Sequence, residues 1–243
     1  MTELATAAAI AVTPRPFAGA WRATRRLLGP LGLARWPLAA DLAGAGAGGR
    51  VRLRACRWRV GPPGRVLAEA RAVHITGPAC DIVNLLIFPR DPGRVPVFAG
   101  ELLAFGGRGR LLFVDLQVPG LSASGRAEVA AATAGLPTGY RLPCDPAPPA
   151  WATESSAGGF LFARANPLVP LSAAEAVRAY ADYLAAWVEV ARRADGGPRR
   201  RDSLDALAAY KRDHMAHSPG QPFLAAKFGA DWAARFLTEF LHR

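Results

Sequence analysis

The sequence predicts a single α+β domain built on one antiparallel sheet, with helices covering both faces of the sheet. Between residues 51 and 118 apolar residues recur with period two, as in strands, and the connections are short and contain no long helix. From residue 172 onward the period becomes that of amphipathic helices. Strands first and helices later, with no internal repeat and no obvious linker, are typical of this fold class.

The first half of the chain is expected to form the sheet. Val51, Leu53 and Ala55 alternate with Arg52 and Arg54, which indicates a half-buried strand with an arginine-lined outer face. The further strands expected are Val66–Ile75, Ile82–Phe88, Pro96–Phe105 and Leu111–Val118. The last two flank Gly106-Gly107-Arg108-Gly109, a connection suited to a hairpin. Before the sheet, Phe17–Leu33 is a candidate amphipathic segment and Ala43–Gly49 a flexible stretch.

The second half is expected to be mainly helical. Ser172 and Glu175 form a capping box, which opens a helix that runs to about Ala194. The other elements expected are a short helix at Ser124–Leu136, a strand at Gly158–Ala165, helices at Ser203–His214 and Pro222–Phe228, and a last helix with Trp232, Phe236 and Phe240 on one face.

Length and composition exclude several classes of protein. With 243 residues, 51% of them hydrophobic, the chain can build a packed core, and its composition is not that of a disordered protein. No stretch reaches the roughly 18 apolar residues that a membrane span needs. The apolar run Leu4–Val12 follows Glu3 and has no basic residues before it, unlike an export signal. We therefore expect a soluble, cytoplasmic protein without a membrane partner.

The net charge of +11 favours an acidic partner. Of the 30 basic residues only Lys211 and Lys227 are lysines, and this skew toward arginine indicates that a GC-rich codon usage contributes to the charge. No groove-reading motif or aromatic-interleaved basic stripe accompanies it, so nucleic-acid binding is not expected.

Metal chemistry and the common catalytic motifs are not indicated. Cys56, Cys80 and Cys144 lie far apart without a C-x-x-C pair, and the sequence has no nucleophile elbow, P-loop or H-E-x-x-H motif. The most unusual feature is a polar residue inside each of two apolar strands, Asn84 and Glu101. Such a side chain either meets a hydrogen-bond partner or lines a cavity, or it points to solvent at a strand end.

Two blocks of sequence carry the most specific functional signal in the chain. The central block consists of Ile87-Phe88-Pro89-Arg90, of Val95 through Leu102 (VPVFAGEL) and of Val114-Asp115-Leu116-Gln117. The second block is the tail from Lys227 to Ala233 (KFGADWA), followed by Phe240-Leu241. The first block resembles the central block of the ferredoxin-dependent bilin reductases, and the second resembles the C-terminal signature of that family. The blocks occur in the family's order, so the chain is identified as a divergent member related to the phycocyanobilin and phycoerythrobilin:ferredoxin oxidoreductases.

The resemblance implies a fold and an activity. The fold is a three-layer α/β/α sandwich with a central antiparallel sheet, and residues 1–243 would form one such domain, with 1–49 as a variable N-terminal segment. The activity is that of an oxidoreductase acting on CH–CH groups: an iron-sulfur protein, reduced ferredoxin, supplies single electrons to biliverdin or a related linear tetrapyrrole. No cofactor is bound, and ferredoxin, the tetrapyrrole and a haem oxygenase are the candidate partners.

The same resemblance implies catalytic residues. The family's central aspartate, a proton donor, falls at Glu101, and a position that is His or Asn in different branches falls at Asn84. A glutamate that protonates a vinyl group in one branch falls near Ala72 and is lost. His74, two residues along the same strand, is a candidate replacement as proton donor. A C-terminal aspartate of some branches falls at Ser218, and His217 beside it is the second candidate donor.

Arginines are expected to hold the two propionates of the bilin, and Arg108, Arg110 and Arg164 are the candidates, together with Ser218 as a substrate-binding residue. A broad basic face would also steer an acidic ferredoxin. Two alternatives to the leading function stay open: a non-catalytic tetrapyrrole-binding protein, and a reductase of a chlorophyll catabolite. The double bond reduced and the number of electrons transferred are left undecided.

Overall fold

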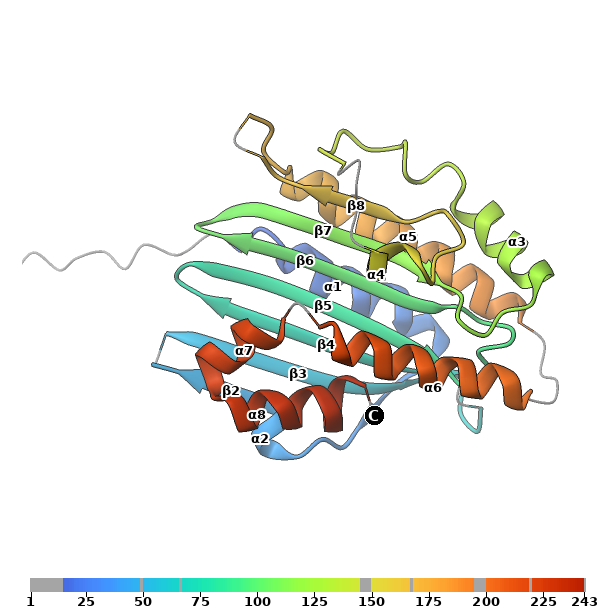
Figure 1. Ribbon diagram of the computed structural model, residues 1–243, viewed down its shortest axis with the longest axis horizontal. Coiled ribbons are helices and arrows are strands. Elements are labelled where there is room, and N and C mark those ends of the chain that lie inside the picture. The colour runs from blue at the N-terminus through green and yellow to red at the C-terminus, as the bar shows by residue number, and fades with distance from the viewer. Residues whose placement is uncertain are drawn as a thin grey trace, which may run out of the picture.

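A computed structural model provides the three-dimensional structure (Figure 1). It describes residues 15–48, 50–65, 67–144, 150–166, 168–194, 200–218 and 220–242. Its centre is an eight-stranded, wholly antiparallel sheet in the order β1-β3-β4-β5-β6-β7-β8, with β2 pairing to β3 beside β1. The predicted α+β class is therefore confirmed.

The long strands come from the segment with period-two alternation. Their bounds are β3 Val51–Val60, β4 Ala68–Gly77, β5 Cys80–Pro89, β6 Val97–Phe105 and β7 Arg108–Gln117, and β8 Leu161–Arg164 closes one edge. Each of the six expected strands is present, the one expected at Gly158–Ala165 as β8. Gly106 and Gly107 join β6 to β7 with φ of +60° and +74°, a left-handed turn that glycine adopts without steric strain.

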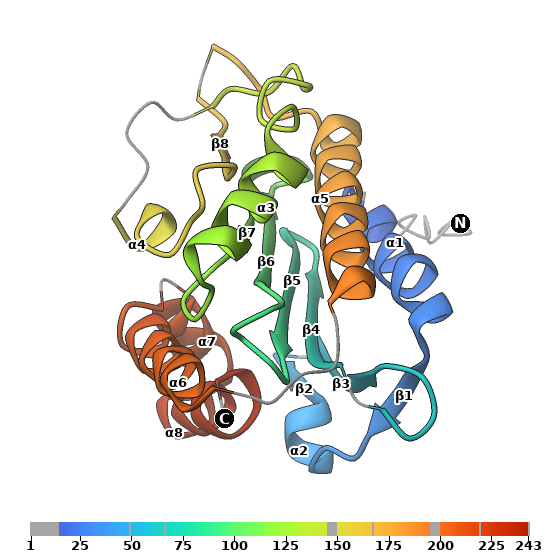
Figure 2. The ribbon, with the colours of Figure 1, turned by 90° about the vertical axis from the view of Figure 1, so that its right-hand side faces the viewer.

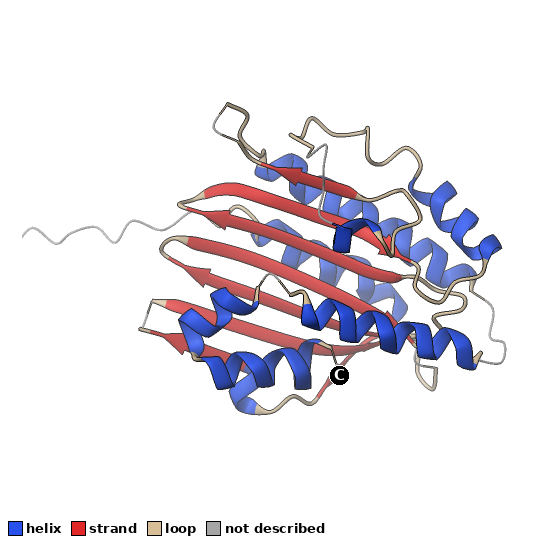
Figure 3. Cartoon of the chain, viewed as in Figure 1, coloured by secondary structure: helices blue, strands red, loops and turns tan. Residues whose placement is uncertain are grey.

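Helices cover both faces of the sheet, which makes the three layers of an α/β/α sandwich (Figure 2). One face carries α1 Ala18–Leu28, α3 Ala123–Thr133 and α5 Ala173–Arg193; the other carries α6 Arg201–Ala216, α7 Gln221–Phe228, α8 Ala230–Arg235 and the π-helical segment η2 Phe236–Leu241. The remaining elements are η1 Gly29–Leu31, α2 Ala40–Ala43 and α4 Ala150–Thr153. Figure 3 shows the sheet enclosed between the two helical layers.

The face under α1 and α5 is a closed hydrophobic core. Trp187, Tyr180 and Tyr183 of α5 are fully buried there. Each finds a partner for its polar atom, because Trp187 Nε1 donates to the Pro96 carbonyl at 2.9 Å and Tyr183 Oη donates to the Gly159 carbonyl at 2.7 Å. Tyr180 Oη lies 2.7 Å from a threonine hydroxyl of α1. With its polar groups satisfied, this face is structural.

The N-terminal segment differs from expectation. Residues predicted to be flexible contain β2 Gly44–Ala47, which pairs with Val51–Arg54 of β3, while β1 Leu33–Trp36 pairs with the other half of β3. Two short strands thus share the edge of one long strand. The amphipathic segment predicted at Phe17–Leu33 begins as α1 and ends as η1. The apolar run Leu4–Val12 lies outside the described residues.

The predicted capping box of α5 is half correct. The Ser172 hydroxyl accepts from the Glu175 backbone N–H at 3.4 Å, as expected. The Glu175 carboxylate, however, accepts from the backbone N–H of Arg141 at 3.2 Å and from the Arg178 guanidinium at 2.7 Å. The guanidinium attracts the carboxylate away from the helix terminus, so Glu175 ties α5 to the loop before β8.

Among the described residues, no helix is long and apolar enough to span a membrane. Within the same part of the chain, no group of three or more His, Cys, Asp or Glu side chains is placed to hold a metal ion.

Candidate active site

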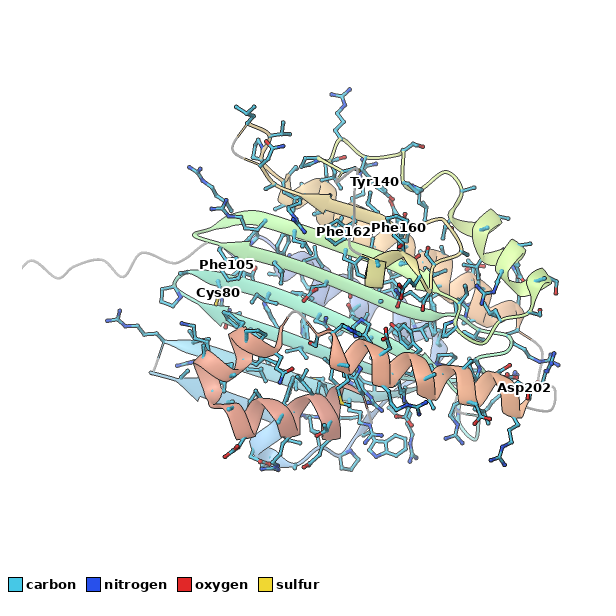
Figure 4. All side chains as sticks on the ribbon, in the orientation of Figure 1. Cys80, Phe105, Tyr140, Phe160, Phe162 and Asp202 are labelled. Carbon is cyan, nitrogen blue, oxygen red and sulfur yellow. The ribbon has the colours of Figure 1, made fainter. Side chains whose placement is uncertain are left out.

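A cavity of about 510 Å³ lies between the sheet and the layer formed by α6, α7 and η2. Its volume falls within the range of about 300–1,000 Å³ that small-molecule sites occupy. Most of its lining is apolar, with Phe105 of β6 and Phe162 of β8 among the sheet residues (labelled in Figure 4). An apolar cavity with a few polar groups in it is what a large organic ligand requires.

The floor of the cavity follows from the register of the sheet. Val73, Asn84, Glu101, Phe113 and Phe162 stand directly opposite one another on β4 to β8, and all five line the cavity. Directly opposed residues of antiparallel strands point to the same face and have Cβ atoms about 5 Å apart. The pairing therefore brings Asn84 and Glu101 together at the centre of the floor.

Glu101 is a carboxyl group in an apolar setting. Within the described part of the chain no hydrogen bond or ion pair reaches it. Burial raises the pKa of Glu101 from 4.5 to about 7, because the charged form loses hydration without gaining a partner. At neutral pH the group is then about half protonated, which is the condition under which a carboxylic acid can both donate and accept a proton.

Asn84 is the polar neighbour of Glu101 on the floor. Its Oδ1 is buried and has no hydrogen-bond partner among the described residues. An unsatisfied buried amide oxygen destabilises a fold by about 1–3 kcal/mol. Two adjacent polar groups without partners, both in a cavity, indicate a site arranged for a ligand.

Of the two neighbouring residues predicted for the roof of the cavity, the structure places only Ser218 there, so the prediction for His217 is wrong. The His217 side chain is 62% exposed, and its Nδ1 lies 3.1 Å from a carboxylate oxygen of Asp213 on the outer surface of α6. His214, one helical turn earlier, lines the cavity in its place. Positions 207, 210 and 214 share the inward face of α6, but the helix ends at Ala216 and the non-helical backbone of His217 (φ −105°, ψ 16°) takes its side chain off that face.

The prediction for His74 is wrong as well. In β4 Val73 is the residue opposite Asn84, so Val73 faces the cavity, while Ala72 and His74 face the α1 layer. There the His74 ring stacks on Trp21, and its Nε2 lies 2.7 Å from Asp81 Oδ1. The sheet separates this histidine from Glu101, because a shift of one residue along a strand reverses the face.

The three candidate arginines occupy different positions. Arg164 lines the cavity at the β8 edge, where its guanidinium lies 5.4 Å from the Phe162 ring. Arg108 is exposed opposite Phe105, on the cavity side of the sheet but not in the lining. Arg110 is the extra residue at a β-bulge and has no partner in the register. Of the three, the structure brings only Arg164 to the cavity.

A further polar group beside the cavity was not expected from the sequence. Asp115 stands opposite Ala99, a lining residue, and accepts from the Ser156 hydroxyl at 3.2 Å. Burial raises the pKa of Asp115 to about 7. Two residues along, the Gln117 side chain accepts a hydrogen bond from the Tyr210 hydroxyl of α6. The Tyr210–Gln117 hydrogen bond attaches α6 to β7 beside the cavity, and the Asp115–Ser156 bond attaches the segment before β8 to the same strand.

Helical periodicity could have identified His214. Ser203, Leu207 and Tyr210 are the buried residues of α6, and His214 continues their spacing of three and four. Arg71 could have been found from the period-two alternation of β4, since it shares the cavity face of that strand with Val73. Its side chain is 1% exposed, and it donates to the backbone carbonyl of Phe240 at 2.8 Å.

The polar groups of the cavity can both bind a ligand and protonate it. A protonatable carboxyl group and an amide lie side by side on the floor, an imidazole forms part of the roof, and a guanidinium lies at one edge. Such a set can bind an extended apolar molecule with an anionic end, hydrogen-bond its polar atoms and deliver protons to its centre.

Comparison with known proteins identifies a family and a shared fold. The family model of the ferredoxin-dependent bilin reductases matches residues 56–243. Phytochromobilin synthase from tomato, solved in complex with biliverdin, superposes with a TM-score of 0.73 at 15% identity over 91% of this chain and 80% of that chain, so the two share a fold. A structure of PcyX gives a TM-score of 0.48 at 11% identity over 89% of this chain and 93% of that chain. Among curated protein sequences there is no match.

Proposed function

The chain belongs to the ferredoxin-dependent bilin reductase family, and from this premise we propose that it reduces biliverdin or a related linear tetrapyrrole with single electrons from reduced ferredoxin. The observation that carries the proposal is the pair formed by Glu101 and Asn84 on the floor of an apolar cavity. A cavity that only stored an apolar ligand would not need a carboxyl group with a pKa near 7 at its centre.

Glu101 is the proposed proton donor. An electron added to a conjugated tetrapyrrole makes it more basic, and the protonated carboxyl group then transfers its proton to the reduced pigment. The resulting carboxylate takes up a proton from solvent before the next step. Because the pKa of Glu101 lies near 7, both the transfer and the reloading proceed without a large free-energy difference at neutral pH.

Asn84 and Arg164 are the proposed positioning residues. The unpartnered Oδ1 of Asn84 can accept a hydrogen bond from a pyrrole N–H, which would orient the pigment over Glu101. Arg164 lies at the β8 edge, where a propionate of the pigment could form a charge-assisted hydrogen bond. The aromatic side chains Phe105, Phe113 and Phe162 would pack on the conjugated system.

Electrons are proposed to come from a ferredoxin that docks transiently, with no redox cofactor held by the chain. The net charge of +11 supports steering of an acidic donor. We also propose that residues 1–243 act as one domain. In support of this, α1, β1 and β2 precede the family match, yet they pack on or pair within the same sheet.

The test is anaerobic turnover of biliverdin with a generic reduced ferredoxin, followed by chromatographic identification of the pigment. Binding should first shift and sharpen the red absorption band, and reduction should then give a blue-shifted product. A Glu101→Gln variant, which keeps the size of the side chain but cannot donate a proton, should bind the pigment and accumulate a radical. Glu128→Gln, on the exposed surface of α3, is the matched control and should behave as the parent protein.

Binding without any product after complete reduction of the ferredoxin would refute the proposal and favour a non-catalytic tetrapyrrole-binding protein. Turnover of a chlorophyll catabolite in parallel assays, with none of biliverdin, would assign the reductase a different substrate.

A further inference from the structure

His214 is a titratable side chain in the wall of the cavity that the proposed function leaves unused. It belongs to α6, whereas Asn84 and Glu101 belong to the sheet, and the helix lies over the sheet in Figure 2. The two potential proton donors therefore approach the cavity from opposite walls. A planar ligand between them would present one face to each.

The packing of α6 holds His214 in this position. Tyr210, one turn earlier, lies with its ring centroid 5.5 Å from that of His214, and its hydroxyl is bound to Gln117 of β7. This hydrogen bond fixes the rotation of the helix about its axis. The imidazole is consequently directed at the cavity and not at solvent.

A second histidine lies behind the first. The ring centroids of His242 and His214 are 5.1 Å apart. His242 is only 6% exposed, and neither of its ring nitrogens has a hydrogen-bond partner among the described residues. It also lines a separate groove of about 430 Å³ between α6 and η2, together with Lys211 and Arg212. The two imidazoles thus lie between the cavity and an outer groove.

Charged and titratable groups face this pair from every neighbouring element. They are Lys211, Tyr210 and Asp213 on α6, Arg71 on β4 with its partner Glu69, and Glu101 across the cavity. Burial lowers the pKa of both histidines. For His214 the Asp213 carboxylate opposes this effect, while His214, Arg71 and Lys211 lower the pKa of His242 further. Negative charge on a bound ligand would raise the pKa of His214 and load it with a proton.

We propose that His214 is a second proton donor to the pigment reduced in the cavity and that His242 reloads it from the groove. This inference rests on the proposed function. Two single electrons and two protons convert the pigment to its dihydro form. One proton comes from the Glu101 carboxyl group and the other from the imidazolium N–H of His214. The neutral imidazole left behind regains its proton from water in the groove through His242.

The test isolates His214 by removing the other donor. In a Glu101→Gln background the biliverdin complex is reduced by pulse radiolysis, which supplies one electron without ferredoxin, and the decay of the pigment radical is followed by its absorbance. Adding His214→Gln should slow this decay at least tenfold at pH 8, and the decay should recover as the pH falls to 6, because solvent protons replace the lost donor. Adding His217→Gln, which changes an exposed histidine three residues away, should leave the decay unchanged.

Two further variants separate a proton-transfer role from a structural one. In the His214→Ala variant, added imidazole should restore the decay of the radical. A weak base of a different shape should restore it as well, because it can donate a proton although it cannot repair the packing. His242→Gln should leave the first proton transfer intact and slow repeated turnover.

Decay in the Glu101→Gln/His214→Gln protein at the rate and pH dependence of Glu101→Gln would overturn the inference. Absence of turnover with ferredoxin in the parent protein would refute the proposed function alone, because the radiolysis comparison supplies its electron without ferredoxin. Failure of the parent protein to bind biliverdin would refute both.

Discussion

Replacing Glu101 by Gln should make the protein more stable, and by an amount that grows with pH. The rise in the pKa of Glu101 from 4.5 to about 7 means that the folded protein holds its proton more tightly than the unfolded chain does. Between these values stability falls as the pH rises, by up to about 1.4 kcal/mol per pH unit. The whole interval corresponds to about 3 kcal/mol, an upper value because the side chain keeps some contact with water in the cavity.

The expected result is a difference between two stability curves. At pH 4 the free energies of unfolding of the parent protein and Glu101→Gln should agree, and by pH 8 the variant should be more stable by up to about 3 kcal/mol. Asp115, whose pKa is raised to about 7 as well, titrates in both proteins, so its effect cancels in the difference. Urea denaturation followed by tryptophan fluorescence, repeated from pH 4 to pH 8, measures both curves.

The matched control is Glu128→Gln, which removes the same charge from the exposed surface of α3. Its stability curve should run parallel to that of the parent protein. If the Glu101→Gln curve is also parallel, the carboxyl group titrates normally. The arguments for proton donation at neutral pH would then be refuted.

Three further substitutions test the cavity and its support. Asn84→Leu removes the unpartnered amide, so the empty protein should gain about 1–2 kcal/mol in urea denaturation while an absorbance titration shows weaker biliverdin binding. Arg164→Gln should weaken biliverdin binding about tenfold at low salt and less at high salt, and no change in affinity at either salt concentration would exclude Arg164 as a propionate ligand. Gly100→Ala places a methyl group 2.8 Å from Tyr180 and 2.9 Å from Phe98, so it should cost about 1–3 kcal/mol of stability; an unchanged Tm would show that the rings can move aside.

Local patterns in the sequence were sufficient to locate the five long strands of the sheet and β8, but not β1 and β2. The alternation of apolar and polar residues in β3, and the apolar runs of β5 and β6, reflect burial that acts on each residue directly. β2 Gly44–Ala47 was missed because the segment has no side-chain pattern to detect. It becomes a strand because the edge of β3 beside it offers unpaired backbone groups.

The histidines show where local patterns stop being informative. His74 and His217 each lie near the correct segment but face away from the cavity, one across the sheet and the other exposed just after the C-terminal end of α6. A shift of one residue in a strand reverses the face, and the end of α6 at Ala216 releases His217 from the helical spacing that directs His214 inward. His214 follows the inward spacing of α6, yet only its packing on the sheet shows that it reaches the cavity.

The sequence by itself determined the fold class, the family resemblance, and the choice of Glu101 and Asn84 as unusual polar residues, because each of these depends on residue type and on spacing along the chain. The tertiary structure decided that Glu101 and Asn84 are neighbours, that Val73 and not Ala72 completes their row, and that of the three candidate arginines only Arg164 lines the cavity. Those outcomes depend on strand register and helix rotation. Both are set by contacts between segments far apart in the sequence, which no local pattern contains.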